Sequence, residues 1–337
     1  MSKNLNIAIN GFGRIGRAVC KIIIEKYPSY KIVAINDLTD TETLAHLLKY
    51  DSAYGIYDKN VSADEKNIII NSKKIPLFSE KDPTLLPWGK MKVDVVLECT
   101  GRFTNKESLN LHIEAGAKKV ILSAPAKGES KVKTIVIGVN DDKINKDDNI
   151  LSCASCTTNC LAPVTDIIRK NFGIKKALMS TIHAYTADQN LVDGPHKDLR
   201  RARSAALNIV PTTTGAASAI AQTIPSLKGF FDGLAVRVPI AVGSLCDTVF
   251  LLKKKVKEED VVKVFIKASK EKKYKNIIEA SSEPLVSSDI VKNSHSAIVD
   301  LSLTKVVDGD LLKVISWYDN EWGYSCRLAD LISYLKF

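Results

Sequence analysis

Near its start the chain reads Leu5-Asn6-Ile7-Ala8-Ile9-Asn10-Gly11-Phe12-Gly13-Arg14-Ile15-Gly16. The first six residues predict a buried strand, and apolar residues then recur at helical spacing from 19 to 23. The G-x-G-x-x-G pattern therefore lies between a strand and a helix, which is the context of the dinucleotide-binding fingerprint. Gly11 and Gly13 would let the backbone turn and approach a pyrophosphate, and Gly16 would let the helix pack close to the strand.

A second strand, 31–36, ends at Asp37. An acidic residue about 20 positions after the glycines is where a ribose 2′-hydroxyl binds in such folds. Its charge would repel a 2′-phosphate, so the sequence favours NAD over NADP. The alternative is an ordinary tight turn followed by a surface aspartate.

Strand and helix patterns continue to alternate through the first half of the chain. A strand at 93–98, a helix at 106–115 and a strand at 120–123 follow one another. This alternation predicts an α/β, Rossmann-type, doubly wound parallel sheet. Thr100 and Ser123 come just after strand ends, where ligands bind in such sheets.

The pattern changes after about residue 150, where helices become fewer. A helix is expected at 258–270, and apolar residues of the last segment, 325–335, share one helical face. Long strands are expected at 178–184, 234–238, 248–252, 297–301 and 311–317. We therefore expect a second, α+β catalytic domain with a mainly antiparallel sheet.

Composition narrows the class of protein. The chain has 337 residues, of which 45% are hydrophobic, so two domains with sizeable cores are expected. No apolar run is long enough for a membrane span, and residues 1–4 leave no room for a signal peptide before the first strand. The seven cysteines favour a reducing, cytoplasmic compartment over a disulfide scaffold. The formal net charge of +10 favours anionic partners.

One cysteine lies among small hydroxyl residues, in the stretch Ala154-Ser155-Cys156-Thr157-Thr158-Asn159-Cys160. Thr157 or Thr158 is a candidate cap for the helix that follows, and a thiol at a helix N-terminus is biased towards thiolate. His183, at the end of a predicted strand, is a candidate base that would lower the thiol pKa. The alternatives are a small buried Cys156 and a metal site that uses Cys153, Cys156 and Cys160.

These motifs together resemble the glyceraldehyde-3-phosphate dehydrogenase family. The resemblance rests on stretches that run through nearly the whole chain: 9–17, 154–163, 183–186, 211–217 and 317–324. It implies two domains, an NAD-binding domain at 1–155 completed by a C-terminal helix at 322–337, and a catalytic domain at 156–321. It also implies a homotetramer in which a loop at about 185–203 packs near a neighbouring NAD site.

The resemblance further implies roles for single residues, and no metal. Cys156 would be the nucleophile and His183 its acid/base partner. The attacking inorganic phosphate would be bound by Ser155, Thr157, Thr214 and Gly215. The substrate phosphate would be held by Thr186 and Arg237, with Arg201 a further anion contact. NAD would be surrounded by Gly11, Phe12, Gly13, Arg14, Ile15, Asp37, Thr100, Ser123 and Asn320.

The resemblance implies oxidation and phosphorylation of D-glyceraldehyde 3-phosphate, by NAD and inorganic phosphate, through a cysteine thioester. Cys153 and Cys326 depart from the family pattern, since both stand where asparagine is usual. Two other functions stay open. One is an erythrose-4-phosphate dehydrogenase, and the other is a basic RNA-binding or scaffold protein, with nucleic acid also conceivable as a secondary partner.

Overall fold

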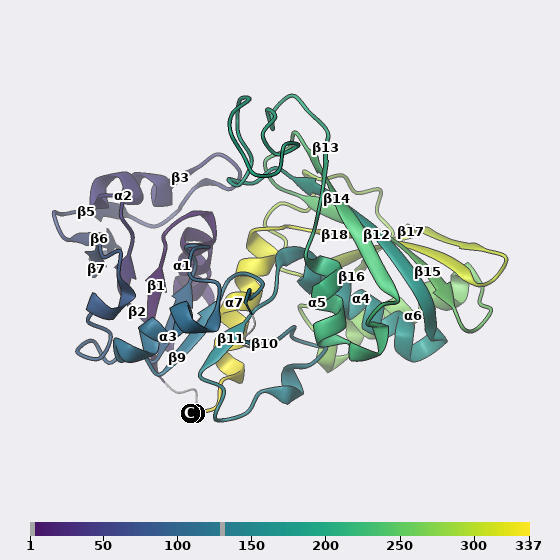
Figure 1. Cartoon of the computed structure of the whole chain (residues 1–337), viewed down its shortest axis with the longest axis horizontal. Coiled ribbons are helices and arrows are strands. Elements are labelled where there is room, and N and C mark those ends of the chain that lie inside the picture. Colours follow the sequence, from purple (N-terminus) through teal and green to yellow (C-terminus); the bar gives the residue numbers. More distant parts are fainter. Residues whose placement is uncertain (1–3, 129–131) are drawn as a thin grey trace. The chain divides into compact units, whose positions relative to one another are not determined.

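The computed structural model describes residues 4–128 and 132–337. The chain forms two compact units (Figure 1). The first comprises Met1–Ile135, Asp142–Ala154 and Ser325–Phe337, and the second comprises Val136–Asp141 and Ser155–Tyr324. Residues 1–3, over which the absence of a signal peptide was predicted, lie outside the described residues.

The first unit is built on a nine-stranded sheet with the order β10-β11-β9-β8-β1-β2-β7-β6-β5. Its strands are β1 (Leu5–Asn10), β2 (Tyr30–Asn36), β5 (Val61–Ala63), β6 (Asn67–Ile70), β7 (Lys73–Phe78), β8 (Val95–Glu98), β9 (Lys119–Leu122), β10 (Lys133–Thr134) and β11 (Ile150–Ser152). A small separate ladder pairs β3 (Tyr50–Asp51) with β4 (Gly55–Ile56).

The strands from β10 to β7 are parallel, and β5 and β6 extend the sheet in antiparallel fashion. The chain order reverses at β1, which has β2 on one side and β8 on the other. Ligands of doubly wound sheets bind at the carboxyl ends of the strands beside such a reversal. The predicted Rossmann-type fold is thereby confirmed.

Helices cover this sheet. They are α1 (Arg14–Lys26), α2 (Thr41–Lys49) and α3 (Lys106–Glu114), with short 3-10 turns η1 (Pro83–Leu85) and η2 (Asp141–Lys143). Helix α1 packs on β1 and β2, and α3 packs on β9 and β11. The last helix, α7 (Trp322–Tyr334), enters the first unit from Ser325 onward, and its Asp330 accepts a hydrogen bond from Tyr27 of that unit.

The second unit contains a seven-stranded sheet with the order β13-β14-β12-β15-β18-β17-β16. Its strands are β12 (Ile174–Ala184), β13 (Val210–Thr212), β14 (Phe231–Val238), β15 (Ser244–Leu252), β16 (Ile278–Ser281), β17 (Ala297–Val307) and β18 (Leu311–Tyr318). Four of its pairings are antiparallel, and β12–β14 and β16–β17 are parallel. The predicted mainly antiparallel sheet is confirmed.

Three helices, α4 (Cys156–Phe172), α5 (Ala216–Thr223) and α6 (Glu258–Lys270), pack against this sheet and α4 contacts the other two (Figure 1). Short turns η3 (Pro225–Leu227) and η4 (Lys272–Tyr274) follow α5 and α6.

Helix α6 has the predicted bounds because its charges suit the helix dipole. Three acidic residues occupy its first turn and Lys267 and Lys270 its last. Helix α7 starts at the residue expected for the C-terminal helix, Trp322, where Asp319 accepts hydrogen bonds from the backbone N–H groups of Glu321 and Trp322, and it ends at Tyr334.

Candidate active site

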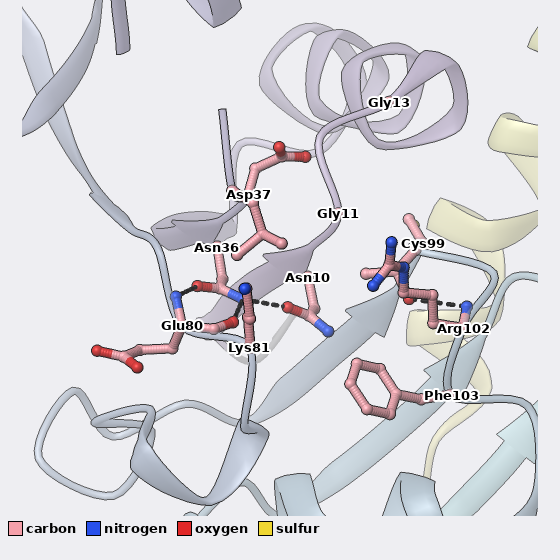
Figure 2. Close-up of a pocket in the computed structure, with 12 residues that line it drawn as sticks. Asn10, Gly11, Gly13, Asn36, Asp37, Glu80, Lys81, Cys99, Arg102 and Phe103 are labelled. Carbon is pink, nitrogen blue, oxygen red and sulfur yellow. Dashed lines mark hydrogen bonds between the residues drawn. The ribbon is translucent and has the colours of Figure 1, made fainter. Parts of the chain in front are cut away.

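A pocket of about 360 Å³ opens in the first unit at the reversal between β1 and β8 (Figure 2). It is lined by Asn10, Gly11, Gly13, Asn36, Asp37, Leu38, Glu80, Lys81, Cys99, Thr100, Arg102 and Phe103. Most of these residues follow the carboxyl ends of β1, β2, β7 and β8. The pocket therefore lies where a doubly wound sheet binds nucleotides.

Two of the three fingerprint glycines, Gly11 and Gly16, are sterically required within the chain, whereas a Cβ on Gly13 would meet no atom within 4 Å. Gly11 has φ +89°, and a Cβ there would lie 2.6 Å from the backbone nitrogen of Thr100. A Cβ on Gly16 would lie 2.1 Å from the carbonyl oxygen of Gly11. Helix α1 begins after Gly13 with no side-chain cap and no acidic residue in its first turn. These features fit a dinucleotide, because the N–H groups at a helix start suit a pyrophosphate.

Asp37 lies just after β2, and two backbone N–H groups fix its carboxylate. Oδ2 accepts from the N–H of Phe12 at 2.7 Å, and Oδ1 accepts from that of Thr39 at 3.0 Å. Figure 2 shows Asp37 beside the glycine turn. The carboxylate is therefore held at the pocket in one orientation.

The other residues expected around NAD do not all line this pocket. Gly11, Gly13, Asp37 and Thr100 do. Among the residues that do not, Phe12 is fully buried and Ile15 is half-buried. Arg14 forms an ion pair with Asp51 at 2.9 Å. The backbone N–H of Ser123 donates to the carbonyl of Glu98 at 2.9 Å. Asn320 belongs to the second unit, where its Oδ1 accepts from the N–H of Gly243 at 3.1 Å and the hydroxyl of Ser244 at 3.0 Å.

Several lining residues were not predicted, notably Asn10, Asn36 and Cys99. Their signal was positional, since each ends or follows a strand of the parallel sheet. The sequence alone does not show that β1, β2 and β8 are neighbours, so it did not single them out.

In the second unit, the candidate nucleophile is the first residue of α4. The expectation that Thr157 or Thr158 caps this helix is wrong. Ser155 is the cap, because its extended backbone places Oγ to accept from the N–H of Thr158 at 3.1 Å. Thr157 and Thr158 already lie in the first turn. Cys156 therefore sits at the positive end of a 17-residue helix.

His183, at the end of β12, faces this thiol although 27 residues separate the two along the chain. Its Nε2 lies 3.5 Å from Cys156 Sγ. Its Nδ1 lies 2.7 Å from the carbonyl oxygen of Ala184. Arg237 Nη1, which can only donate, lies 3.2 Å from the same nitrogen. Because the carbonyl can only accept and its contact is the shorter of the two, we assign the proton to Nδ1, and in this tautomer the unprotonated Nε2 faces the sulfur. His183 is thus oriented to accept the thiol proton.

Burial opposes the ionised form of each partner. It raises the pKa of the Cys156 thiol, although Arg237 and the Thr157 hydroxyl act in the opposite direction. Burial, with Arg237, lowers the pKa of His183 to about 3. The sequence-based expectation of a lowered thiol pKa is therefore not met by Cys156 alone. His183 Nε2 is the acceptor placed to take the thiol proton, and the helix N-terminus favours the resulting thiolate.

Tyr318, which the sequence did not single out, connects the residues around this pair. Its hydroxyl lies 3.0 Å from Thr157 Oγ1 and 2.8 Å from Thr181 Oγ1. Its ring meets that of His183 edge-on, with centroids 5.9 Å apart. Tyr318 therefore braces the first turn of α4 and the imidazole at the same time.

Two of the expected anion-binding residues meet beside His183. Arg237 Nη1 donates to Thr186 Oγ1 and to the Ala184 carbonyl, each at 3.2 Å. Arg237 Nε is buried and has no hydrogen-bond partner among residues 4–128 and 132–337. A guanidinium with an unused buried donor next to a hydroxyl suits a phosphate group.

Of the remaining anion candidates, Ser155 and Thr157 lie at the start of α4, and Thr214, Gly215 and Arg201 lie in or beside the turn before α5. Gly215 is the N-cap of α5, and the Thr214 hydroxyl accepts from the N–H of Ala216 at 3.2 Å. Arg201 braces the neighbouring strand, with Nε 2.9 Å from Thr212 Oγ1 and Nη2 3.0 Å from the Thr213 carbonyl, and it pairs with Asp188. Arg201 is thus already engaged within the protein.

Cys160 and Cys156 belong to the same helix but have different neighbours. Cys160 Sγ lies 3.3 Å from Ser316 Oγ in the core of the second unit.

Within the described part of the chain, no three His, Cys, Asp or Glu side chains are grouped as metal ligands. The described helices include none that is long and apolar enough to cross a membrane.

Comparison with known proteins gives matches over both units. Residues 5–106 match the family model described as the NAD binding domain of glyceraldehyde 3-phosphate dehydrogenase, and residues 155–320 match the C-terminal domain of the same family. Proteins named glyceraldehyde-3-phosphate dehydrogenase from Mycobacterium avium, Borreliella burgdorferi and Geobacillus stearothermophilus are 53%, 52% and 51% identical to this chain. The matches cover 97–98% of this chain and 98% of each relative. The chain therefore belongs to the glyceraldehyde-3-phosphate dehydrogenase family of NAD-dependent oxidoreductases.

Proposed function

We propose that the chain oxidises D-glyceraldehyde 3-phosphate to 1,3-bisphosphoglycerate with NAD and inorganic phosphate, using Cys156 and His183 as catalytic residues. The observation that carries this proposal is the 3.5 Å contact between Cys156 Sγ, at a helix N-terminus, and Nε2 of His183. In the proposed division of labour, residues 1–155 with 322–337 bind NAD, and residues 156–321 catalyse the reaction.

NAD, when bound, accepts the hydride from the substrate. The proposed contacts are the glycine turn and helix start for the pyrophosphate, and Asp37 for a ribose hydroxyl. Phe12, Arg14, Ile15, Ser123 and Asn320 remain proposed cofactor neighbours.

The covalent steps belong to Cys156 and His183. As the sulfur attacks the aldehyde carbon, its proton moves to His183 Nε2, and a hemithioacetal forms. His183 next passes this proton to the nascent alkoxide, which becomes the hydroxyl of the hemithioacetal. Nε2 is then free of its proton and acts as the general base towards that hydroxyl. Loss of hydride leaves a thioester on Cys156. Attack by inorganic phosphate releases the acyl phosphate and returns the thiolate.

Two anion sites serve the two phosphates. Arg237 and Thr186 hold the substrate phosphate, supported by their mutual contact at 3.2 Å. Inorganic phosphate is held by Ser155, Thr157, Thr214 and Gly215, which supply hydroxyls and helix-start N–H groups. Arg201 contributes charge while bracing residues 212 and 213.

A homotetramer is proposed as the assembled form. Its support is a run of exposed apolar side chains in the segment before β13, namely Leu191, Val192, Leu199, Leu207 and Ile209, which are 69–83% exposed in the single chain. Apolar patches of this kind mark protein interfaces.

The seven free cysteines support a cytoplasmic location, and the charge of +10 leaves nucleic acid as a secondary partner.

Asp37 is expected to determine the choice of cofactor. Asp37→Gly and Asp37→Asn both remove the charge that would meet a 2′-phosphate. The value of kcat/KM for NAD divided by that for NADP should therefore fall by about tenfold or more. Steady-state kinetics with both cofactors measure this ratio. Glu65→Gln, at an exposed position of the same unit, is the matched control. Equal use of both cofactors by the unmodified protein would refute the assignment of Asp37.

The aldehyde is tested by comparing substrates. We expect kcat/KM for glyceraldehyde 3-phosphate to exceed that for erythrose 4-phosphate, with both reactions dependent on Cys156. A higher kcat/KM for erythrose 4-phosphate would reassign the substrate. Salt-sensitive RNA binding without turnover of either aldehyde would instead favour the scaffold function.

A further inference from the structure

Beneath the pocket of the first unit lies a buried polar network that the proposed function does not use. It centres on Glu98, the last residue of β8, and on His112 of α3, both of which are fully inaccessible to solvent. Neither residue lines the pocket. An isolated buried carboxylate is costly, so its presence in an apolar strand requires an explanation.

The Glu98 carboxylate accepts from four donors. Oε1 accepts from the backbone N–H of Thr100 at 2.8 Å and from the Thr100 hydroxyl. Oε2 accepts from Asn10 Nδ2 at 2.5 Å and lies 3.1 Å from His112 Nε2. No lysine or arginine among residues 4–128 and 132–337 forms an ion pair with it. The acceptor sites of both oxygens are thus filled by uncharged donors.

Trp88 sets the direction of the two bonds that run through His112, and the 3.4 Å contact between Asn10 Nδ2 and His112 Nε2 then joins two donors and is no hydrogen bond. Trp88 Nε1 can only donate, and it lies 3.1 Å from His112 Nδ1. His112 Nδ1 is therefore the acceptor, and Nε2 carries the proton that is donated to Glu98. The buried Trp88 and His112 in this way hold the carboxylate in one orientation.

The same bonds fix two residues that do line the pocket. Asn10 donates to Glu98 through Nδ2, and its Oδ1 accepts from Asn36 Nδ2 at 2.7 Å (Figure 2). The Thr100 hydroxyl donates to Glu98 and accepts from the N–H of Arg102 at 3.0 Å. Asn36 is itself held by the backbone of Glu80, through bonds of 2.9 Å in both directions.

We propose that Glu98, oriented by His112 and Trp88, is a positioning residue that holds Asn10 and Thr100 in the geometry that binds NAD. Asn10 and Glu98 are paired in register on the neighbouring strands β1 and β8, so one carboxylate spans the reversal point of the sheet. A wall that is ordered before the ligand arrives loses less conformational entropy on binding. This inference rests on the proposed placement of NAD in this pocket.

The direct test is Glu98→Gln. The amide nitrogen of glutamine must face either the two Thr100 donors or the Asn10 and His112 donors, so two of the four bonds are lost. We expect the Kd for NAD to rise about tenfold when NAD is titrated by calorimetry into protein without substrate. The KM for NAD should rise by a similar factor. We expect kcat at saturating NAD and the KM for the aldehyde to stay within about twofold, since Cys156 and His183 are untouched.

Two variants of His112 separate positioning from packing. His112→Gln keeps an acceptor for Trp88 and a donor for Glu98, so NAD affinity should stay near that of the unmodified protein. His112→Phe keeps a ring but removes both polar atoms, so it should raise the Kd and KM for NAD as Glu98→Gln does. Glu65→Gln again controls for loss of a carboxylate, and thermal unfolding of each ligand-free variant reports its folding.

An unchanged Kd for NAD in folded Glu98→Gln would overturn the proposal, as would equal affinities of His112→Gln and His112→Phe. Failure of both Glu98→Gln and His112→Phe to fold would also overturn it, because the network would then serve the core alone. If Asp37→Gly shifts cofactor choice while the Glu98 and His112 variants bind NAD normally, the pocket assignment stands and only the positioning role fails.

Discussion

Cys156→Ser is expected to abolish aldehyde oxidation while NAD binding persists. A serine hydroxyl at the start of α4 keeps the shape of the side chain but ionises far less readily than a thiol, and its ester would lack the reactivity of the thioester. The expected loss in kcat is on the order of 10⁴-fold or more, as for removal of other covalent nucleophiles. The measurement is NADH formation from glyceraldehyde 3-phosphate, together with calorimetric titration of NAD.

Cys160→Ser is the matched control, because it changes the other thiol of the same helix, which contacts Ser316 and not His183. It should retain turnover within a few-fold. Near-normal turnover by Cys156→Ser would refute the assignment of the nucleophile.

The second large effect is expected for His183→Asn. The variant removes the only base placed against Cys156 Sγ in the described part of the second unit, so kcat should fall by about 10²–10⁴-fold. The pH midpoint for alkylation of Cys156 by iodoacetamide should also rise. Burial raises the pKa of this thiol, and loss of the imidazole removes the proton acceptor that makes the thiolate accessible.

A pH series of alkylation rates, with mass spectrometry to locate the label, measures the midpoint. His46→Asn, at an exposed position of α2, is the control and should leave the midpoint unchanged. If Cys153 or Cys160 is labelled first, or if His183→Asn has the midpoint of the unmodified protein, the Cys156–His183 pair is not the activating unit.

The local parts of this fold were predictable because they depend on nearby residues. Strand β1 and helix α6 have the predicted bounds, the first set by an apolar run that ends at a glycine turn and the second by charged helix ends. The start of α4 was misplaced because hydroxyl residues occupy several consecutive positions. Only the backbone geometry of Ser155 shows which of them caps the helix.

The candidate site was predictable as a set of residue types but not as an arrangement. Cys156 and His183 were identified separately, and their contact depends on β12 packing beside α4. The thiol pKa was misjudged because the sequence does not reveal burial, which outweighs the opposing effects of Arg237 and Thr157.

The Glu98 network was missed for a related reason. A glutamate at a strand end usually contacts water, and only the strand order shows that Glu98 lies between Asn10 and His112. Tyr318 was missed because its hydroxyl acts through Thr157 and Thr181, which are remote from it in sequence.

The most direct test of the proposed chemistry is the dependence of NADH formation on inorganic phosphate, with glyceraldehyde 3-phosphate and NAD at saturation. A thioester on Cys156 that is released by phosphate predicts rapid, sustained NADH formation with phosphate. Without phosphate it predicts a burst of about one NADH per Cys156, followed by slow hydrolysis. Sustained NADH formation at the same rate in the absence of phosphate would contradict this account.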